Sequence, residues 1–169
     1  MRKAEFVRIF EETHLPLFRF ALRLTGSAIE AEDVVQECFL ELLRPECSYD
    51  PDRTPVRTYL FGVVRNQSLK RLRKSPTGPE TRRQTTPEDQ VLQEEAGEIV
   101  AAAIAQLPDD QREVLILAHY ERLPLAEVAQ IVGSEIGAVK SRLQRARETL
   151  RDVLGSYAPE LKERWERNR

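Results

Sequence analysis

Apolar residues recur at helical spacing along most of the chain, and no stretch alternates in the way that indicates a β-strand. The clearest case lies toward the C-terminal end. There a short amphipathic helix is predicted by the stripe Leu125, Val128, Ala129 and Val132. Gly133 then acts as a helix stop, and a second helix is predicted from about 136 to 154. Its inward stripe is Val139, Leu143, Ala146, Leu150 and Leu154.

The outer face of this second helix carries cations and amides. One narrow arc contains Lys140, Gln144, Arg147 and Arg151, flanked by Ser141 and Arg145. Residues 136–147 contain no acid. A helix that packs on one side and presents such groups on the other suits the DNA major groove. A solvated surface helix is the alternative, but the missing acids, the glycine turn and a further helix predicted over 108–120 disfavour it.

Prolines and capping residues divide the N-terminal half into four predicted helices. The first begins around Phe6, and Pro16 opens a second that ends at Gly26. Ser27 and Glu30 form a capping box for a third helix over 28–44. After a loop, the fourth begins with Thr54 as its cap and Pro55 in first position. Residues 75–89 are polar, rich in proline and without periodicity, which predicts a flexible linker.

Charge is sorted along this half, although the net charge of the whole chain is only −2. Residues 30–52 contain one base, Arg44, and the acids Glu30, Glu32, Asp33, Glu37, Glu41, Glu46, Asp50 and Asp52. Residues 53–74 contain no acid and the bases Arg53, Arg57, Arg65, Lys70, Arg71, Arg73 and Lys74. A basic helix can follow phosphates, whereas an acidic helix suits a basic protein surface, so this pattern predicts two different partners.

The composition of the chain argues against a membrane-spanning, metal-binding or enzymatic protein. The chain has 169 residues, enough for one or two small domains, and no apolar run long enough to cross a bilayer. Cys38 and Cys47 lack the spacing of a metal site, and Cys38 is predicted to be a packed thiol. His14 and His119 stand alone and are interpreted as structural or surface residues. We expect no enzyme, no cofactor and no metal.

Two segments carry a family resemblance. The run LPDDQREVLILAHYERLPLAEVAQIVGSEIGAVKSRLQRARETL resembles the −35-binding domain of bacterial RNA polymerase sigma factors, closest to the extracytoplasmic-function group. AEDVVQECFLELLR and YDPDRTPVRTYLFGVVRNQSLKRLRK are similar in order and spacing to the polymerase-binding and −10-binding segments of that family. The resemblance covers residues 6–154 and implies an all-α fold of two small helical domains. Region 2 is expected at 1–74, a flexible linker at 75–90, region 4 at 91–154 and a C-terminal extension at 155–169.

The resemblance also implies roles for particular residues. Contact with the clamp coiled coil of core polymerase is expected from Asp33, Gln36, Glu37, Phe39 and Leu40. Contact with the −10 element is expected from Tyr49, Asp50, Arg53, Arg57, Arg65, Asn66, Lys70 and Arg73, with Asn66 on a base and the helix cations on phosphate. Tyr59 stands where the family usually has Trp and is expected to fill the core. Reading of the −35 element is expected from Lys140, Ser141, Gln144 and Arg145, with phosphate contacts from Arg142 and Arg147.

The expected partners are core RNA polymerase, through its clamp and flap, promoter DNA and an anti-sigma factor in the bacterial cytoplasm. Apolar residues around Ile104, Leu107 and Leu115 are expected to pack either internally or against the flap. Two other functions remain as alternatives. One is a helix-turn-helix regulator that never joins core polymerase, and the other is a sigma mimic or anti-sigma adaptor that reads no promoter. A run-off transcription assay with core polymerase separates all three.

Overall fold

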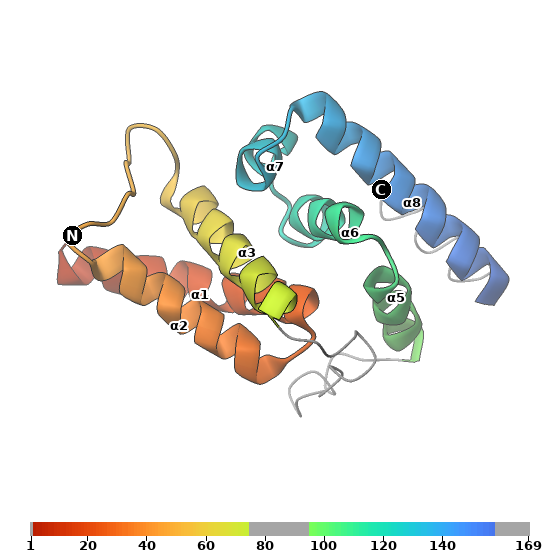
Figure 1. The fold of residues 1–169 in the computed structure, drawn as a ribbon, viewed down its shortest axis with the longest axis horizontal. Helices are drawn as coiled ribbons and strands as arrows, with labels where there is room; N and C mark the ends of the chain where they lie inside the picture. The colour runs from red at the N-terminus through yellow and green to blue at the C-terminus, as the bar shows by residue number, and fades with distance from the viewer. Residues whose placement is uncertain (1, 75–94, 158–169) are drawn as a thin grey trace.

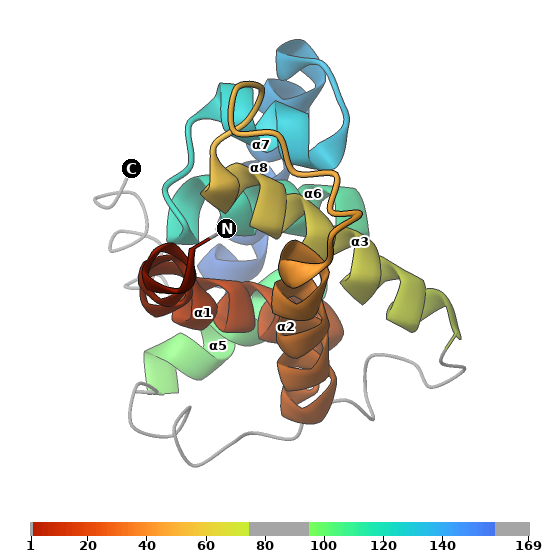
Figure 2. The same ribbon diagram turned by 90° about the vertical axis from the view of Figure 1, so that its left-hand side faces the viewer.

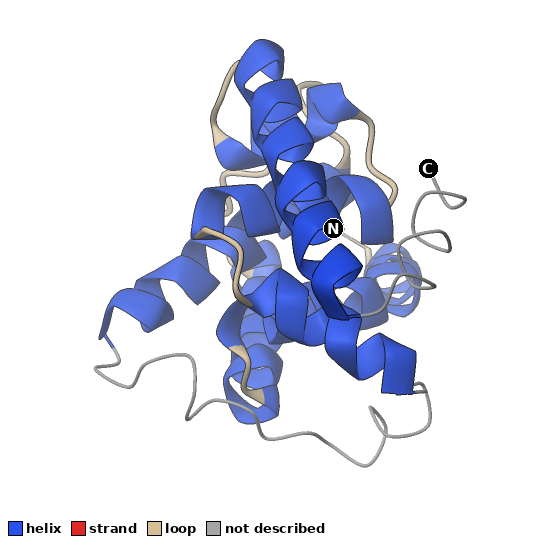
Figure 3. Ribbon diagram, turned by 90° about the vertical axis from the view of Figure 1, so that its right-hand side faces the viewer, coloured by secondary structure: helices blue, strands red, loops and turns tan. Residues whose placement is uncertain are grey.

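The computed structural model describes residues 2–74 and 95–157, and over these ranges the chain forms helices without β-strands (Figures 1 and 3). The helices are α1 (Lys3–Thr25), α2 (Ala28–Leu43), α3 (Val56–Lys74), α5 (Glu95–Ala105), α6 (Asp109–Leu115), η2 (Ile116–Tyr120), α7 (Leu125–Val132) and α8 (Ile136–Tyr157). The all-helical fold class expected from the sequence is confirmed. The predicted linker at 75–90 lies outside the described residues, as do 158–169 of the predicted C-terminal extension.

Residues 3–25 form one helix, so the expected break at Pro16 is wrong. The buried stripe of α1 runs past the proline and consists of Ile9, Thr13, Leu17, Phe20, Ala21, Leu24 and Thr25. A proline inside a helix removes one backbone hydrogen bond. Burial of a continuous apolar stripe outweighs that loss, because each large side chain contributes about 1.5–3 kcal/mol. The helix ends where predicted, at Gly26, whose φ of 69° places it in the left-handed region.

The cap of α2 confirms half of the predicted capping box. Ser27 Oγ accepts a hydrogen bond of 3.3 Å from the Glu30 N–H, which satisfies one free donor of the first turn. The Ser27 N–H does not return to Glu30; it donates to Thr25 Oγ1 at 3.3 Å. The side chain of Thr25, at the end of α1, therefore links the two helices across the short turn.

Helices α1, α2 and α3 pack into an N-terminal module around two aromatic rings. Phe20 and Phe61 are fully buried, and their ring centroids lie 5.3 Å apart in an edge-to-face arrangement. Cys38 is also fully buried, with Sγ 3.7 Å from the Leu60 carbonyl oxygen. Burial raises the pKa of the Cys38 thiol to about 12, with smaller effects from Glu41 and Cys47. The prediction of a packed thiol is confirmed.

The helix-turn-helix in the C-terminal half closely follows its prediction. α7 has the expected ends, and Gly133 follows it with φ 64° and ψ 42°, a conformation that strains residues with a Cβ atom. The inward stripe of α8 is buried along its whole length, at Val139, Leu143, Ala146, Leu150 and Leu154. Ile104, Leu107 and Leu115 are buried as well, which favours internal packing over a flap contact for these side chains.

The helix predicted over 108–120 widens in its last turn. α6 continues into η2, a π-helical turn in which the Glu121 N–H donates to the Ile116 carbonyl at 3.1 Å. Arg122 then adopts a φ of 52°, rare for a residue other than glycine. This change of direction puts Tyr120 and Glu121 beside the N-terminal module, where both contact the Arg23 side chain.

The two modules touch each other. The first part of α3 packs against α7, as Figures 1 and 2 show, and η2 contacts α1. The sequence predicted two modules joined by a tether but contained no sign of a contact between them. The contact joins segments that are far apart in the sequence, and it involves several predicted DNA-binding residues.

Candidate functional site

The acidic face predicted on α2 is present and accessible. Asp33, Gln36 and Glu37 are all exposed, and the side chains of Asp33 and Glu37 keep 58% and 53% of their accessible surface. Leu40 is 59% exposed next to them. Phe39 is only 5% exposed, because its ring packs against those of Phe6 and Phe10. The surface at this face is therefore formed by Leu40 and the polar trio, with Phe39 supporting it from below.

Arg71 of α3 reaches across to this acidic face. Its guanidinium nitrogens lie 3.4 Å from Asp33 Oδ2 and 3.1 Å from Glu37 Oε2. Both carboxylates are more than half exposed, so solvent screens the pairs and each contributes about 0–1 kcal/mol. A cationic partner surface could replace Arg71 at little cost. The sequence did not indicate this link, because its two sides lie 34 and 38 positions apart.

The loop between α2 and α3 holds its aromatic and acidic residues in place. The rings of Tyr49 and Tyr59 lie 5.2 Å apart, and Tyr59 Oη is 3.3 Å from Ser48 Oγ. Burial raises the pKa of both tyrosines above the usual value. Asp50 Oδ1 accepts from the Asp52 N–H at 3.0 Å, which makes Asp50 a turn-forming residue.

The predicted −10 residues on α3 differ in their contacts. Asn66, Lys70 and Arg73 are exposed and line an open groove of about 490 Å³ together with Arg65, Leu69 and Lys74. Arg57 and Arg65 instead contact the C-terminal module. Arg65 donates to both carboxylate oxygens of Glu113, and Arg57 Nη2 donates to the Glu121 carbonyl oxygen at 3.1 Å. The sequence pattern did not indicate this difference.

The outer arc of α8 is largely as predicted. Lys140, Ser141, Gln144 and Arg145 are exposed on one side of the helix. Lys140 and Arg145 form no ion pair within the described residues, and Gln144 Nε2 donates to Glu148 Oε1 at 2.7 Å. Exposed cations and an amide in one arc match the donors that guanine and adenine edges accept in the major groove.

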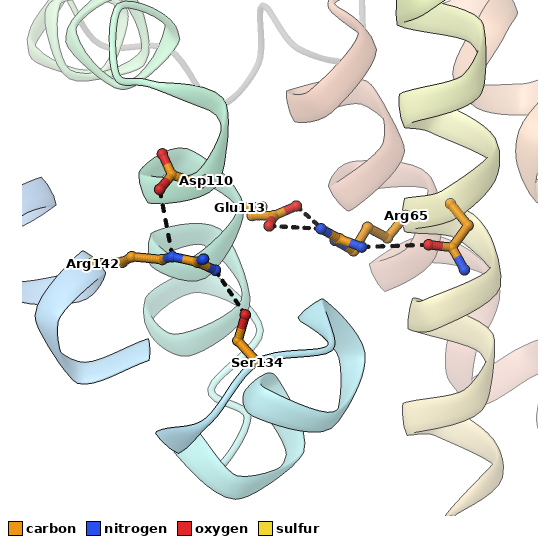
Figure 4. A network of polar contacts seen from close by, with 6 residues as sticks. Arg65, Asp110, Glu113, Ser134 and Arg142 are labelled. Atoms are coloured by element: carbon orange, nitrogen blue, oxygen red, sulfur yellow. Dashed lines mark hydrogen bonds and ion pairs between the residues drawn. The ribbon is translucent and has the colours of Figure 1, made fainter. Parts of the chain in front are cut away.

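Arg142 and Arg147 lie differently from this arc. Arg142 Nε is 3.4 Å from Asp110 Oδ2, and its Nη1 donates to Ser134 Oγ at 3.1 Å (Figure 4). Arg142 therefore ties α8 to α6 and to the turn of the motif. Arg147 is half-buried. The pKa of His119 is lowered mainly by burial of the imidazole, and the positive charge of Arg147 lowers it further. To make the predicted phosphate contacts, both side chains would have to leave the positions that they occupy here.

The described residues contain no cluster of three or more potential metal-binding side chains. Within the same ranges, no helix is both long and apolar enough to cross a bilayer. The features that remain are charged and amide-bearing surfaces on three helices. Such surfaces suit macromolecular binding.

Both modules match families of known proteins. Residues 9–76 match sigma-70 region 2, and residues 97–150 match sigma-70 region 4. The extracytoplasmic-function sigma factor SigL of Mycobacterium tuberculosis is 38% identical over 155 residues, which cover 86% of each chain. The chain belongs to the extracytoplasmic-function sigma factors. SigW of Bacillus subtilis, of the same group, is 29% identical over 168 residues and covers 89% of this sigma factor and 88% of its own chain.

Solved structures agree with this sigma-factor fold. CnrH in complex with the cytosolic domain of CnrY aligns with a TM-score of 0.72 at 24% identity, covering 92% of this chain and 90% of CnrH. RpoE in complex with the anti-sigma factor NepR from Bartonella quintana aligns with a TM-score of 0.69 at 23% identity, covering 89% and 96%. The sigma factor is a transcription initiation factor that directs core polymerase to promoters, and it is not an enzyme.

Proposed function

We propose that this sigma factor binds core polymerase and promoter DNA through three separate surfaces. The acidic face of α2 binds the clamp coiled coil of core polymerase, α3 and the loop before it bind the −10 element, and the outer arc of α8 reads the −35 element. The observation that carries the proposal is the segregation of charge: exposed carboxylates on α2, and exposed cations and amides on α3 and α8. The polymerase acts on chromosomal DNA, which locates this function in the bacterial cytoplasm.

The polymerase surface rests on Asp33, Gln36 and Glu37. Their i, i+3 and i+4 spacing puts two carboxylates and an amide side by side, and Leu40 adds an exposed apolar contact. A cationic protein surface gains charge-assisted hydrogen bonds from such a face. The exposed pairs with Arg71 would be exchanged for pairs with the partner.

The −10 surface combines the groove along α3 with the loop that holds Tyr49 and Arg53. Lys70 and Arg73 neutralise backbone phosphates, and the Asn66 amide can both donate to and accept from a base edge. Taking a base out of the stack costs a few kcal/mol, which these contacts must offset. Arg57 and Arg65 belong to this surface when they are released from the C-terminal module.

The −35 surface is the arc of Lys140, Ser141, Gln144 and Arg145. Lysine and arginine can donate to guanine N7 and O6, and glutamine can bond adenine N6 and N7. The exposure of all four side chains supports direct reading of base edges. An anti-sigma factor is the further partner that we propose, since RpoE forms a complex with the anti-sigma factor NepR.

Run-off transcription with purified core polymerase tests the function. The full-length sigma factor is expected to make core polymerase start at defined sites on a chromosomal promoter library, whereas core polymerase alone does not. A helix-turn-helix regulator would bind the same DNA without conferring initiation on core polymerase. Failure to confer specific starts, with the protein folded and free of an inhibitor, would overturn the proposal.

Asp33→Arg tests the polymerase surface. Reversing a charge in the middle of the acidic face is expected to abolish binding to core polymerase in a pull-down while leaving the helical circular dichroism spectrum intact. Glu46→Arg is the matched control, because Glu46 is an exposed acid in the turn that follows α2, outside the trio. Unchanged core binding by Asp33→Arg would refute the role of this face.

A further inference from the structure

Hydrogen bonds and ion pairs of arginine, glutamate, threonine and glutamine join the two modules. At its centre, Arg65 Nε lies 2.7 Å from Glu113 Oε2, and Arg65 Nη2 lies 2.9 Å from Glu113 Oε1 (Figure 4). The Arg65 side chain is 18% exposed and that of Glu113 only 3%. A carboxylate buried to this extent needs its partner, because an unpaired buried charge is strongly unfavourable.

A second set of contacts surrounds Glu121 at the end of η2. Arg57 Nη2 donates to the Glu121 carbonyl oxygen at 3.1 Å and lies 4.0 Å from its carboxylate. Arg23 lies 3.8 Å from the same carboxylate, and its guanidinium stacks 4.4 Å from the centre of the Tyr120 ring. Two arginines of the N-terminal module thus hold the π-helical turn of the C-terminal module.

A third set joins the start of α3 to α7. Thr58 Oγ1 donates to Glu127 Oε2 at 2.7 Å, and Gln130 Nε2 donates to Thr54 Oγ1 at 2.8 Å. Thr58 and Arg65 are seven residues apart and so share one side of α3, and Thr54 lies just before the start of the helix. This side lies next to the exposed DNA-binding groove. We call these three sets of contacts the closed interface.

The closed interface uses the same groups that the −10 surface needs. Arginine binds carboxylate and phosphate with the same two-pronged geometry, so Glu113 occupies Arg65 in the way that a backbone phosphate would. Arg57 is held by Glu121 at the same time. Asn66, Lys70 and Arg73 remain exposed, so the interface covers only the first half of the DNA-binding side of α3.

We propose that the closed interface is an autoinhibitory contact, in which carboxylates of region 4 mask the −10 surface of region 2 until the modules separate. The inference rests on the proposed function of α3 as a DNA-binding helix. The charge pairs suit a reversible contact, because separation returns both charges of each pair to water. Binding of DNA to Arg65 and its bidentate pairing with Glu113 exclude each other, which couples the two equilibria.

A cross-link across the interface tests the proposal without changing its charges. In the full chain, Thr54→Cys and Gln130→Cys place two thiols where the side chains now bond, with Cys47→Ser removing the other accessible thiol. Cys38 can stay, because it is fully buried and its pKa is raised to about 12. A short bismaleimide then bridges the pair. The bridged chain is expected to bind fluorescent single-stranded DNA of mixed sequence about fivefold or more weakly than the same chain left unbridged.

Glu113→Arg supplies the opposite perturbation. Two guanidinium groups would then face each other, so the Thr54/Gln130 thiol pair is expected to be bridged about fivefold or more slowly, and the DNA to be bound more tightly. Glu135→Arg is the matched control, since it makes the same change of charge at an exposed position of the same module outside the interface. Equal bridging rates in these two variants, or equal DNA affinity of the bridged and unbridged chains, would overturn the proposal.

Arg65→Ala separates this inference from the function on which it rests. If Arg65→Ala weakens DNA binding but bridging does not, α3 is a DNA-binding helix and the autoinhibitory contact is refuted. If neither change affects DNA binding, the −10 role of Arg65 has failed and the inference fails with it. Weakening by both changes supports masking of a genuine DNA-binding surface.

Discussion

The basic helices α3 and α8 are similar in sequence pattern, but they differ in whether their cations are already paired with groups of the same chain. On α8, Lys140 and Arg145 are exposed and form no ion pair within the described ranges. On α3, Arg65 is held by both oxygens of Glu113, and Arg57 is held at the end of η2. One helix that we propose to read the promoter is therefore open in this structure, and the other is half covered by its own chain.

This difference shows that a cationic stripe marks a surface suited to phosphate but does not show whether the surface is free. Carboxylates can satisfy the same donors from within the chain. The covering groups here, Glu113, Glu121 and Glu127, are supplied by the other module. Promoter recognition in this sigma factor would then proceed in two steps, with α8 ready and α3 dependent on opening.

The largest expected effect comes from exchanging the central charge pair. Arg65→Glu sets two carboxylates against each other, and loss of a buried partner costs about 3–5 kcal/mol, so the modules should separate. The doubly changed chain Arg65→Glu with Glu113→Arg should close again. Small-angle scattering measures this as a larger radius of gyration for the single variant and recovery in the double. Arg44→Glu, at an exposed loop position, serves as the control; a double variant as extended as the single one would contradict the pairing.

The next effect concerns the open helix. Lys140→Ala combined with Arg145→Ala removes two proposed base contacts, each worth about 1–3 kcal/mol of discrimination. Transcription from promoters that depend on the −35 element should fall at least tenfold, without any change in the closed interface. Abortive initiation assays on paired promoters measure the loss, and Thr149→Ala, exposed on the same helix, should leave it unchanged. Equal activity of the double variant on all promoters would count against this role for α8.

A smaller effect distinguishes Arg142 from its neighbour Arg145. Arg142→Ala removes the bonds to Asp110 and Ser134, and should lower the free energy of unfolding by about 1 kcal/mol, given that the Asp110 side chain is 52% exposed. Arg145→Ala removes no such contact, so its free energy of unfolding should stay within about 0.5 kcal/mol of that of the parent. Urea unfolding of the full chain measures both. Equal stabilities would mean that Arg142 does not stabilise the module.

The smallest effect is a pH dependence of stability. Burial raises the pKa of Glu121 above its usual 4.5, and the facing Arg23, Arg57 and Arg19 only partly offset this. At this group the folded chain therefore binds more protons than the unfolded chain. The contribution of Glu121 to the free energy of unfolding is present below the unfolded-state pKa and is lost as the pH rises through the folded-state pKa. Urea unfolding of the parent and of Glu121→Gln across this range measures the contribution as a small difference that shrinks as the pH rises; a difference that does not change with pH would point to another group.

The helix-turn-helix was predictable almost to the residue because its determinants are local. Gly133 ends α7 through its own backbone preference, and the stripe from Val139 to Leu154 faces inward by helical spacing alone. Pro16 misled the prediction because a local rule for helix breaking was outweighed by packing of α1 against two other helices. Phe39 is similar: it is next to the acidic trio in sequence, yet its ring is turned toward Phe6 and Phe10.

By itself, the sequence determined the helical fold class, the two modules, the helix-turn-helix and the sorting of charge onto separate faces, since all of these depend on residues within a few turns of one another. Only the tertiary structure decided which cations are free. The pairs of Arg65 with Glu113 and of Thr58 with Glu127 join positions 48 and 69 residues apart. No periodicity or local propensity encodes such pairs, because they depend on how two finished modules dock, and that geometry sets whether a positive charge meets DNA or a carboxylate of its own chain.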